Sequence, residues 1–314
     1  MNDTVLALTL AAAVAAGTPL ALAAIGELIT ERAGILNLGV EGMMLLGAVT
    51  AFLVGNATGD PWTAMLAGSA AGASLALAHA FASISLRANQ IVSGLALVIF
   101  GTGLSTFLGR PVEGMPLPRE ARIPRVAITY LSDLPLIGRM LFTQDVVVYA
   151  SWILAAATAF YLFRTRPGLS LRSVGESPAT ADVMGLRVNA IRYAHTIIGG
   201  VLCGGAGAYL MLARVPAWSQ AATTNGIGFI AIALVVFASW KPWRALLGAY
   251  IFGLALRANF ALQGAGVTFI PAEFLAMTPY LLTILVLVAL SFSDLRKRAG
   301  APEALGVPYA REER

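Results

Sequence analysis

Ionisable and amide side chains interrupt apolar sequence near the start of the chain, in the segment ELITERAGILNLGVEGMMLLGA at 27–48. Glu41 is followed by an apolar run, so its carboxylate lies in a segment of membrane-spanning composition, where a charge must face protein or a wet cavity. Asn37 lies four residues earlier, and on a helix it shares the same face. Either the two side chains line a path for a polar solute, or Glu41 caps or pairs with a neighbouring helix. The polar residues just upstream are expected to form a cytoplasmic turn: Glu27, Glu31 and Arg32.

Other polar side chains also sit at the start of apolar runs or inside them. Asn89 and Gln90 open a run at which Asn either caps a helix or reaches into a cavity. Arg257 lies within a run and either snorkels outward or binds an anionic or hydroxyl-rich substrate. The residues expected to face the substrate path are Asn37, Glu41, Asn89, Gln90, Arg257 and Asn259. His79 and His195 have no second ligand at metal spacing, so we interpret both as packing residues and expect no metal site.

A second informative stretch is RTRPGLSLRSVGESPATADVMGLRVNAIR at 164–192. Its pattern indicates a turn, a short helix near Pro178–Met184, and then Gly185. A plain connection would not need 29 residues with this alternation of polar and small apolar positions. A short helix lying on the membrane surface can dock into a groove of a partner, so we interpret this loop as a docking element.

The elements that position these residues are transmembrane helices. The chain is 58% hydrophobic and only 12% charged, against about 25% charged residues in soluble domains. We predict an all-α integral membrane protein, a polytopic bundle of about nine transmembrane helices in a transmembrane domain at 1–293, followed by a cytoplasmic tail at 294–314. The predicted spans are 5–26, 35–54, 62–85, 91–109, 146–163, 192–213, 226–240, 244–263 and 275–292. Gly68/Gly72 and Gly200/Gly204 have the small-xxx-small spacing of close helix contacts, or arise by chance in a Gly-rich chain.

The positive charge of the chain fits a membrane topology better than a nucleic-acid surface, although the net charge is +5. Most Arg residues lie between apolar runs, as the positive-inside bias requires. The loop at 164–192 and the tail are therefore expected in the cytoplasm, and the N-terminus outside. The Pro-rich loop at 110–145 is then extracellular, ordered only in part, and either contacts a delivery protein or simply connects two spans. Cys203, the single cysteine, is interpreted as a packing residue.

The sequence lacks the motifs of nucleotide binding and of enzyme catalysis. A G-x-x-x-x-G-K-[ST] phosphate loop is absent, so ATP-driven transport requires a separate nucleotide-binding subunit. No catalytic constellation appears, which argues against an intramembrane enzyme, and no cofactor is expected. An ion-gradient-driven secondary transporter of a small polar solute is the alternative, but it needs intramembrane carboxylates, for which Glu41 is the clear candidate.

Several segments resemble one family in sequence and order. ERAGILNLGVEGMMLLGA at 31–48 resembles the signature of bacterial ABC-importer permeases for nucleosides and simple sugars, within the branched-chain amino acid permease superfamily. The further similar segments are ANQIVSGLAL at 88–97, LPLIGRMLF at 134–142, GLSLRSVGESPATADVMGL at 168–186, GIGFIAIAL at 226–234 and the tail APEALGVPYAREER at 301–314. Val98 and Ile99 depart from the Asn-containing continuation expected of the family.

The resemblance implies a permease subunit of a heteromeric importer in the bacterial inner membrane, with alternating access and with nucleoside as the first substrate class. It also implies partners: an ABC ATPase subunit, a second permease subunit in a heterodimer, and an extracellular substrate-binding lipoprotein. The residues that it assigns to ATPase coupling are Gly175, Glu176, Ser177, Pro178, Ala179 and Gly185.

Overall fold

The computed structural model describes residues 3–126, 128, 131–132, 137–215, 217–219, 223–264 and 300–310, with scattered positions between 274 and 288. Within these residues the chain folds into helices, joined by turns and two isolated β-bridges. The α-helices are α1 Asp3–Arg32, α2 Val40–Thr58, α3 Pro61–Ala80, α4 Gln90–Gly109, α5 Ile137–Leu141, α6 Val146–Arg164, α7 Arg166–Glu176, α8 Pro178–Val183, α9 Val188–Ala213, α10 Ile227–Phe237 and α11 Pro242–Gly264. A π-helical turn at Phe81–Ser85 and a 3-10 turn at Arg110–Val112 extend α3 and α4. The all-helical prediction is thereby confirmed.

Six helices in the described part of the chain are long and apolar enough to cross a membrane: Leu6–Arg32, Val40–Thr58, Pro61–Ser85, Gln90–Val112, Val146–Arg164 and Val188–Ala213. They correspond to the first six predicted spans. The seventh predicted span appears as the short apolar helix α10, and the eighth lies within α11. The ninth, at 275–292, falls mostly outside the described residues, so the number nine stays a prediction.

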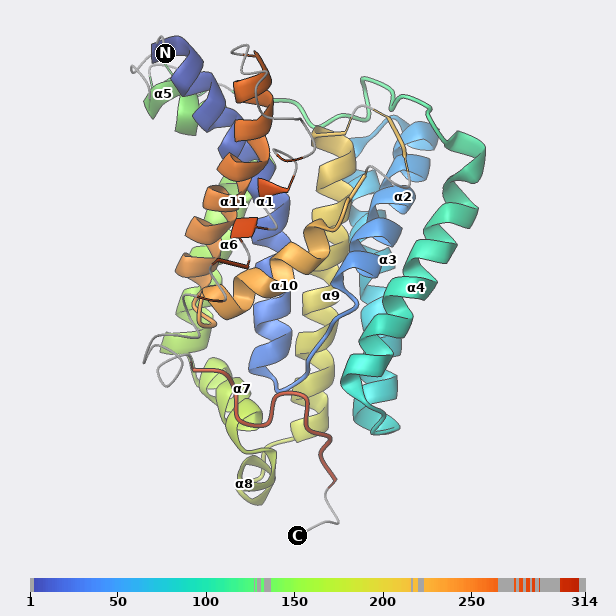
Figure 1. Ribbon diagram of the computed structural model, residues 1–314. Helices are drawn as coiled ribbons and strands as arrows, with labels where there is room; N and C mark the ends of the chain where they lie inside the picture. Colours follow the sequence, from blue (N-terminus) through green and yellow to red (C-terminus); the bar gives the residue numbers. More distant parts are fainter. Residues whose placement is uncertain are drawn as a thin grey trace.

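The bundle has a centre and a periphery. The membrane-spanning windows of α2 and α9 are each 72% buried and that of α1 is 67% buried, whereas that of α4 is only 17% buried. Figure 1 shows α1 and α9 among the other helices and α4 along one side of the bundle. Because a helix that is apolar all round is typical of protein interior or lipid contact, α1, α2 and α9 form the core, and α4 exposes most of its apolar surface.

Small residues bring α3 and α9 into direct backbone contact. The two small-xxx-small pairs predicted from sequence face each other, with Gly68 and Gly72 on α3 against Gly200 and Gly204 on α9. A Cβ atom added to Gly204 would lie 2.5 Å from the carbonyl oxygen of Gly68 and 2.7 Å from the Cα of Gly72. This interface therefore requires glycine, as close packing between membrane helices often does.

The polar turn expected after the first span is not present at that position. Helix α1 continues to Arg32, so Glu27, Glu31 and Arg32 lie in its last turns and are buried. Glu31 accepts a hydrogen bond from Trp240 Nε1 at 2.5 Å, and Arg32 donates to the carbonyl oxygens of Trp240 and Gly300. The charged residues suggested that the helix would end before them. It continues because partners far along the chain, such as Trp240, bind their side chains inside the bundle.

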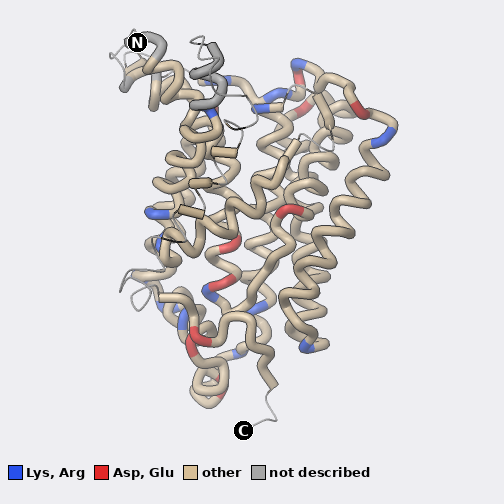
Figure 2. Tube along the Cα trace, in the orientation of Figure 1, with Lys and Arg blue, Asp and Glu red and all other residues tan. Residues whose placement is uncertain are grey.

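The charged residues gather mainly toward the two ends of the bundle, with few between them (Figure 2). One end holds the start of α1 and the connection after α4, and the other holds α7, α8 and residues 300–310 (Figure 1). This distribution is typical of a membrane-spanning protein. The assignment of the α7–α8 end to the cytoplasm stays a prediction from the Arg distribution.

Candidate functional site

The carboxylate of Glu41 lies at the N-terminus of α10 inside the bundle. Its Oε1 atom accepts hydrogen bonds from Thr224 Oγ1 at 2.5 Å and from the Gly226 amide at 3.0 Å. Its Oε2 atom accepts from the Gly228 amide at 2.7 Å, and the side chain is only 6% exposed. Gly226, the N-cap residue, has φ 78° and no side chain to cap its helix. Glu41 therefore supplies the cap from α2, and its charge also faces the positive end of the α10 dipole.

The backbone between α1 and α2 is non-helical from residue 33 to residue 39, and buried side chains satisfy its polar groups. Glu27 Oε1 accepts from the Asn37 amide at 3.0 Å, and Gln90 Oε1 accepts from the Leu36 amide at 2.7 Å. His79 Nε2 lies 3.1 Å from the Leu36 carbonyl oxygen, and Asn37 Oδ1 accepts from the Gly39 amide at 2.9 Å. Irregular backbone within a membrane bundle is tolerated only where such partners exist.

Three of the six residues predicted to face the path lie in or beside the connection between α1 and α2, which we call the junction. Asn37 and Gln90 bind its backbone, and Glu41, at the start of α2, caps α10. Asn89 does not join them, because its exposed side chain caps α4 through the amides of Ile91 and Val92 at 3.0 and 3.1 Å. For both Asn89 and Glu41 the sequence left a choice between capping a helix and facing the path, and the observed bonds are those of a cap. Contact with a substrate stays a prediction for all six residues.

The remaining two predicted path residues lie in α11. Arg257 is half-buried and within electrostatic range of Arg125 and Arg214. Asn259 lies in the described part of the helix, but its side chain falls outside the described atoms. These two residues belong to a different region from the junction at Glu41.

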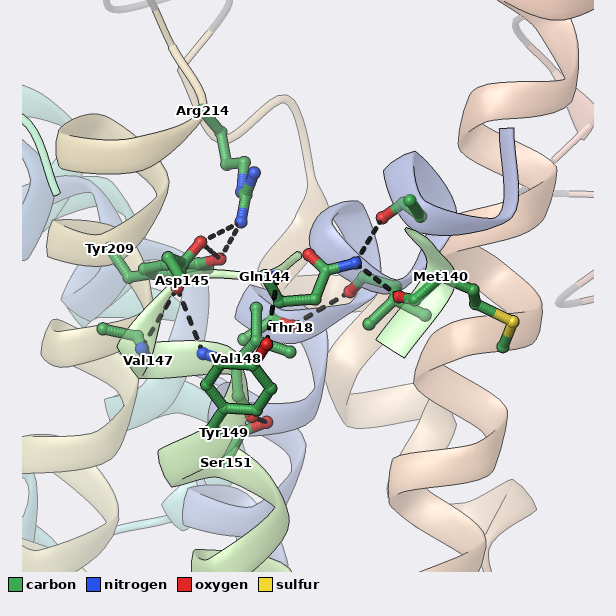
Figure 3. A network of polar contacts seen from close by, with 12 residues as sticks. Thr18, Met140, Gln144, Asp145, Val147, Val148, Tyr149, Ser151, Tyr209 and Arg214 are labelled. Carbon is green, nitrogen blue, oxygen red and sulfur yellow. Dashed lines mark hydrogen bonds and ion pairs between the residues drawn. The ribbon is translucent and has the colours of Figure 1, made fainter. Parts of the chain in front are cut away.

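A polar network missed by the sequence interpretation joins α1, α6 and α9 (Figure 3). Asp145 caps α6 through the amides of Val147 and Val148, both at 3.1 Å. It also accepts a hydrogen bond from Tyr209 at 2.9 Å and forms an ion pair with Arg214. The signal available in the sequence was an Asp directly before the apolar run at 146–163, a typical N-cap position.

The loop at 164–192 contains a helix that the sequence interpretation described only as a turn. Helix α7 spans Arg166–Glu176, and Thr165 Oγ1 caps it by accepting from the Gly168 amide at 3.1 Å. Its buried positions are Gly168, Leu171, Val174 and Gly175. This three-to-four-residue spacing places them on one helix face, and it was visible in the sequence together with Thr165 as N-cap and Pro167 near the helix start.

The predicted short helix is present as α8, Pro178–Val183, one residue shorter than expected. Ser177 caps it by accepting from the Thr180 amide at 3.4 Å, and its Oγ lies 2.8 Å from Thr180 Oγ1. After the helix, the amides of Gly185 and Leu186 donate to the carbonyl oxygens of Asp182 and Ala181 at 2.9 and 3.0 Å. This is the Schellman arrangement, with Gly185 at φ 83° as the left-handed residue.

The tip of α8 carries apolar side chains at the surface: Val183 is 67% exposed and Met184 is 78% exposed. Behind the tip, a cavity of about 700 Å³ lies between α7, α8 and the end of α1. Its lining combines charged residues with an apolar wall; among them are Arg32, Arg172, Glu176, Phe163, Leu169 and Met184. Helices α7 and α8, which we call the α7–α8 projection, therefore present exposed apolar side chains and a groove of mixed polarity at the same end of the bundle.

Comparison with known proteins decides the family. Residues 9–290 match the family described as branched-chain amino acid transport system, permease component. The chain belongs to this permease family. The match covers almost the whole bundle, so the resemblance noted from the sequence segments is confirmed, and the chain is a multi-pass membrane component of a transport system.

Full-length relatives support the same conclusion. The chain is 42% identical to the putative glucose ABC transporter permease protein TsgC13 of Haloferax volcanii, over 96% of this chain and 97% of the relative. It is 37% identical to the guanosine ABC transporter permease protein NupQ of Bacillus subtilis, over 99% and 98%. It is also 37% identical to the nucleoside ABC transporter permease protein NupC of Lactococcus lactis, over 93% of each chain.

Proposed function

We propose that this chain is the path-forming permease subunit of an ABC importer and that separate ATPase subunits act on it through the α7–α8 projection. The observation that carries this proposal is the exposed apolar tip of α8, formed by Val183 and Met184. A helix of six residues is too short to cross a membrane, and exposed apolar side chains at such a tip are typical of a protein contact. The coupling residues are Gly175, Glu176, Ser177, Pro178, Ala179 and Gly185.

The proposed substrate is a nucleoside or a simple sugar. The substrates in the names of the relatives, which are guanosine, nucleosides and glucose, support this class. The junction at Glu41 supports a path nearby, because α2 and α10 both begin inside the bundle. Buried polar side chains lie beside these helix starts, among them Asn37, Glu41 and Gln90, and polar side chains inside a membrane bundle are typical of a substrate path. Asn89, Arg257 and Asn259 complete the proposed set of path residues.

The proposed assembly contains a second, different permease chain and an extracellular substrate-binding lipoprotein. The similarity of this chain to two permeases of one organism supports a heterodimer. It resembles both the putative glucose permease TsgC13 and, at 26% identity over 75% of this chain, the glucose ABC transporter permease protein TsgB13 of Haloferax volcanii. On this proposal the α7–α8 end faces the cytoplasm and the start of α1 faces outward.

Reconstitution of the assembled complex into liposomes with ATP inside tests the energy source. We expect uptake of labelled guanosine or glucose that vanadate, an inhibitor of ATP hydrolysis, abolishes and that a protonophore leaves unchanged. Uptake that persists without ATP and stops with the protonophore would contradict the proposal and favour the ion-gradient alternative.

Substitution at the tip tests the role of α8. In the variant Val183→Ser/Met184→Ser we expect uptake to fall at least tenfold, since removing apolar anchors from an interface costs more than about 1.4 kcal/mol. The melting temperature of the isolated chain should not change. Leu66→Ser, on the exposed face of α3 where Leu66 is 72% exposed, is the matched control and should transport normally.

A further inference from the structure

The segment 300–310 returns to the bundle and binds the residues assigned to coupling. The amide of Ala304 donates to the carbonyl oxygen of Gly175 at 3.0 Å. The amide of Glu303 donates to Glu176 Oε2 at 3.3 Å. Arg32 Nη1, at the end of α1, donates to the carbonyl oxygen of Gly300 at 3.0 Å. One short stretch of chain is therefore bonded to both α1 and α7.

Packing at this contact is close enough to exclude a side chain. Pro302 and Ala304 are buried. A Cβ atom added to Gly175 would collide with the carbonyl oxygen of Arg32 and lie 3.3 Å from Pro302 Cβ. A Cβ atom on Gly34 would lie 3.4 Å from the Ala304 carbonyl oxygen. The loop after α1, the end of α7 and the segment 300–310 thus meet backbone to backbone.

The far end of the segment contacts the other side of the projection. Tyr309 packs against a small buried cluster of Val174 from α7, Ala181 from α8 and Val188 from α9. The guanidinium carbon of Arg192 lies 5.9 Å from the centre of the Tyr309 ring, a cation–π distance. Tyr309 therefore bridges three helices that are otherwise joined there through short turns.

We propose that residues 300–310 form a strap that holds α7 and α8 in a fixed position against α1 and α9. Helices of 11 and six residues are marginal on their own and need tertiary contacts to persist. The strap supplies such contacts to both helices: to Gly175 and Glu176 at the end of α7, and to Ala181 of α8 through Tyr309. If α7–α8 is the coupling element of the proposed function, the strap keeps that element rigid so that a push on its tip moves the bundle.

Hydrogen exchange followed by mass spectrometry on the full chain in lipid nanodiscs tests the strap without reference to any partner. In a chain ending at residue 299, we expect amides of α7 and α8 to exchange at least tenfold faster, because local opening costs less free energy when tertiary contacts are lost. Amides of α6, which has no bond to the strap in the described residues, should exchange at unchanged rates. A chain ending at Ala310 is the matched truncation control and should behave as the intact protein.

Single substitutions locate the effect within the strap. Ala304→Pro removes the amide that binds Gly175, and Tyr309→Ala removes the aromatic bridge, so both should raise exchange in α7–α8. Val307→Ser is the control, because Val307 is 54% exposed and its backbone bond is kept.

The two readouts separate this inference from the proposed function. Unchanged exchange in α7–α8 after removal of residues 300–314 overturns the strap. Faster exchange together with uncoupled ATP hydrolysis in the assembled complex supports both proposals. Faster exchange with normal ATP-driven uptake upholds the strap and instead overturns the coupling role of α7–α8.

Discussion

Two short helices, α10 in the bundle interior and α8 in the projection, are capped in opposite ways. The N-cap residue of α10 is Gly226, and the capping carboxylate comes from Glu41, 185 residues earlier in the chain. The N-cap residue of α8 is Ser177, whose own hydroxyl accepts the Thr180 amide. A cap supplied from another helix exists only in the folded bundle, whereas a local cap forms with its own helix.

The difference in capping matches a difference in burial. Glu41 and Thr224 are 6% and 1% exposed, so a lost bond there leaves donors without water. The hydroxyl pair of Ser177 and Thr180 is exposed, so water replaces a lost bond. We conclude that the cap from Glu41 stabilises the whole bundle, whereas the cap from Ser177 stabilises α8 alone.

Replacing Gly204 by leucine should have the largest effect, because it removes the bundle on which both helices depend. A side chain there collides with the backbone of α3 at Gly68 and Gly72, and backbone cannot yield as a side chain does. We expect loss of monodisperse protein after detergent extraction, measured by size-exclusion chromatography. Gly103→Leu is the matched control, since nothing lies within 4 Å of a Cβ at Gly103. Normal extraction of Gly204→Leu would show that α3 and α9 are not packed as described.

Replacing Glu41 by alanine should unfold the protein at a markedly lower temperature. It leaves three donors, from Thr224, Gly226 and Gly228, without their acceptor. Those of Thr224 and Gly228 are buried, which costs about 1–3 kcal/mol each. Glu41→Gln keeps one acceptor oxygen and should recover part of the loss in a detergent melting assay. Equal melting temperatures for the alanine variant and the natural protein would rule out the capping role.

The sequence predicted the apolar helices well because membrane-spanning length and composition are local properties. It also predicted α8, since Ser177, Pro178 and Gly185 mark a helix start and stop within nine residues. It failed for Glu27, Glu31 and Arg32, whose partners Asn37 and Trp240 lie in other segments. The sequence did not decide between the two roles of Glu41 for the same reason, because a donor on another helix leaves no spacing pattern in the sequence.

Replacing Ser177 by alanine should have a smaller and local effect. Loss of an N-cap side chain costs about 1 kcal/mol of helix stability, and here water replaces the lost acceptor. We expect faster hydrogen exchange in α8 and an unchanged melting temperature of the bundle. Ser177→Asp restores the acceptor and should return exchange to the natural rate. A fall in melting temperature as large as that of Glu41→Ala would remove the contrast between the two helices.

The smallest effect is expected at Asp60, a local and exposed cap at the other end of the bundle. Its carboxylate accepts the amides of Thr63 at 2.8 Å and Trp62 at 3.4 Å, and the bond from Thr63 holds the pKa of Asp60 below its ordinary value of 3.8. A lowered pKa means that the charged form is favoured in the folded state, so the stabilisation is complete above pH 3.8 and is lost as the pH falls through the lowered pKa. Asp60→Ala should therefore melt slightly below the natural protein at pH 7, and the difference should vanish in acid. The side-chain oxygen of Asp60→Asn accepts at every pH, so the melting temperature of this variant should not converge with that of Asp60→Ala in acid. If Asp60→Ala still melts below the natural protein in strong acid, the effect comes from packing rather than from the charged cap.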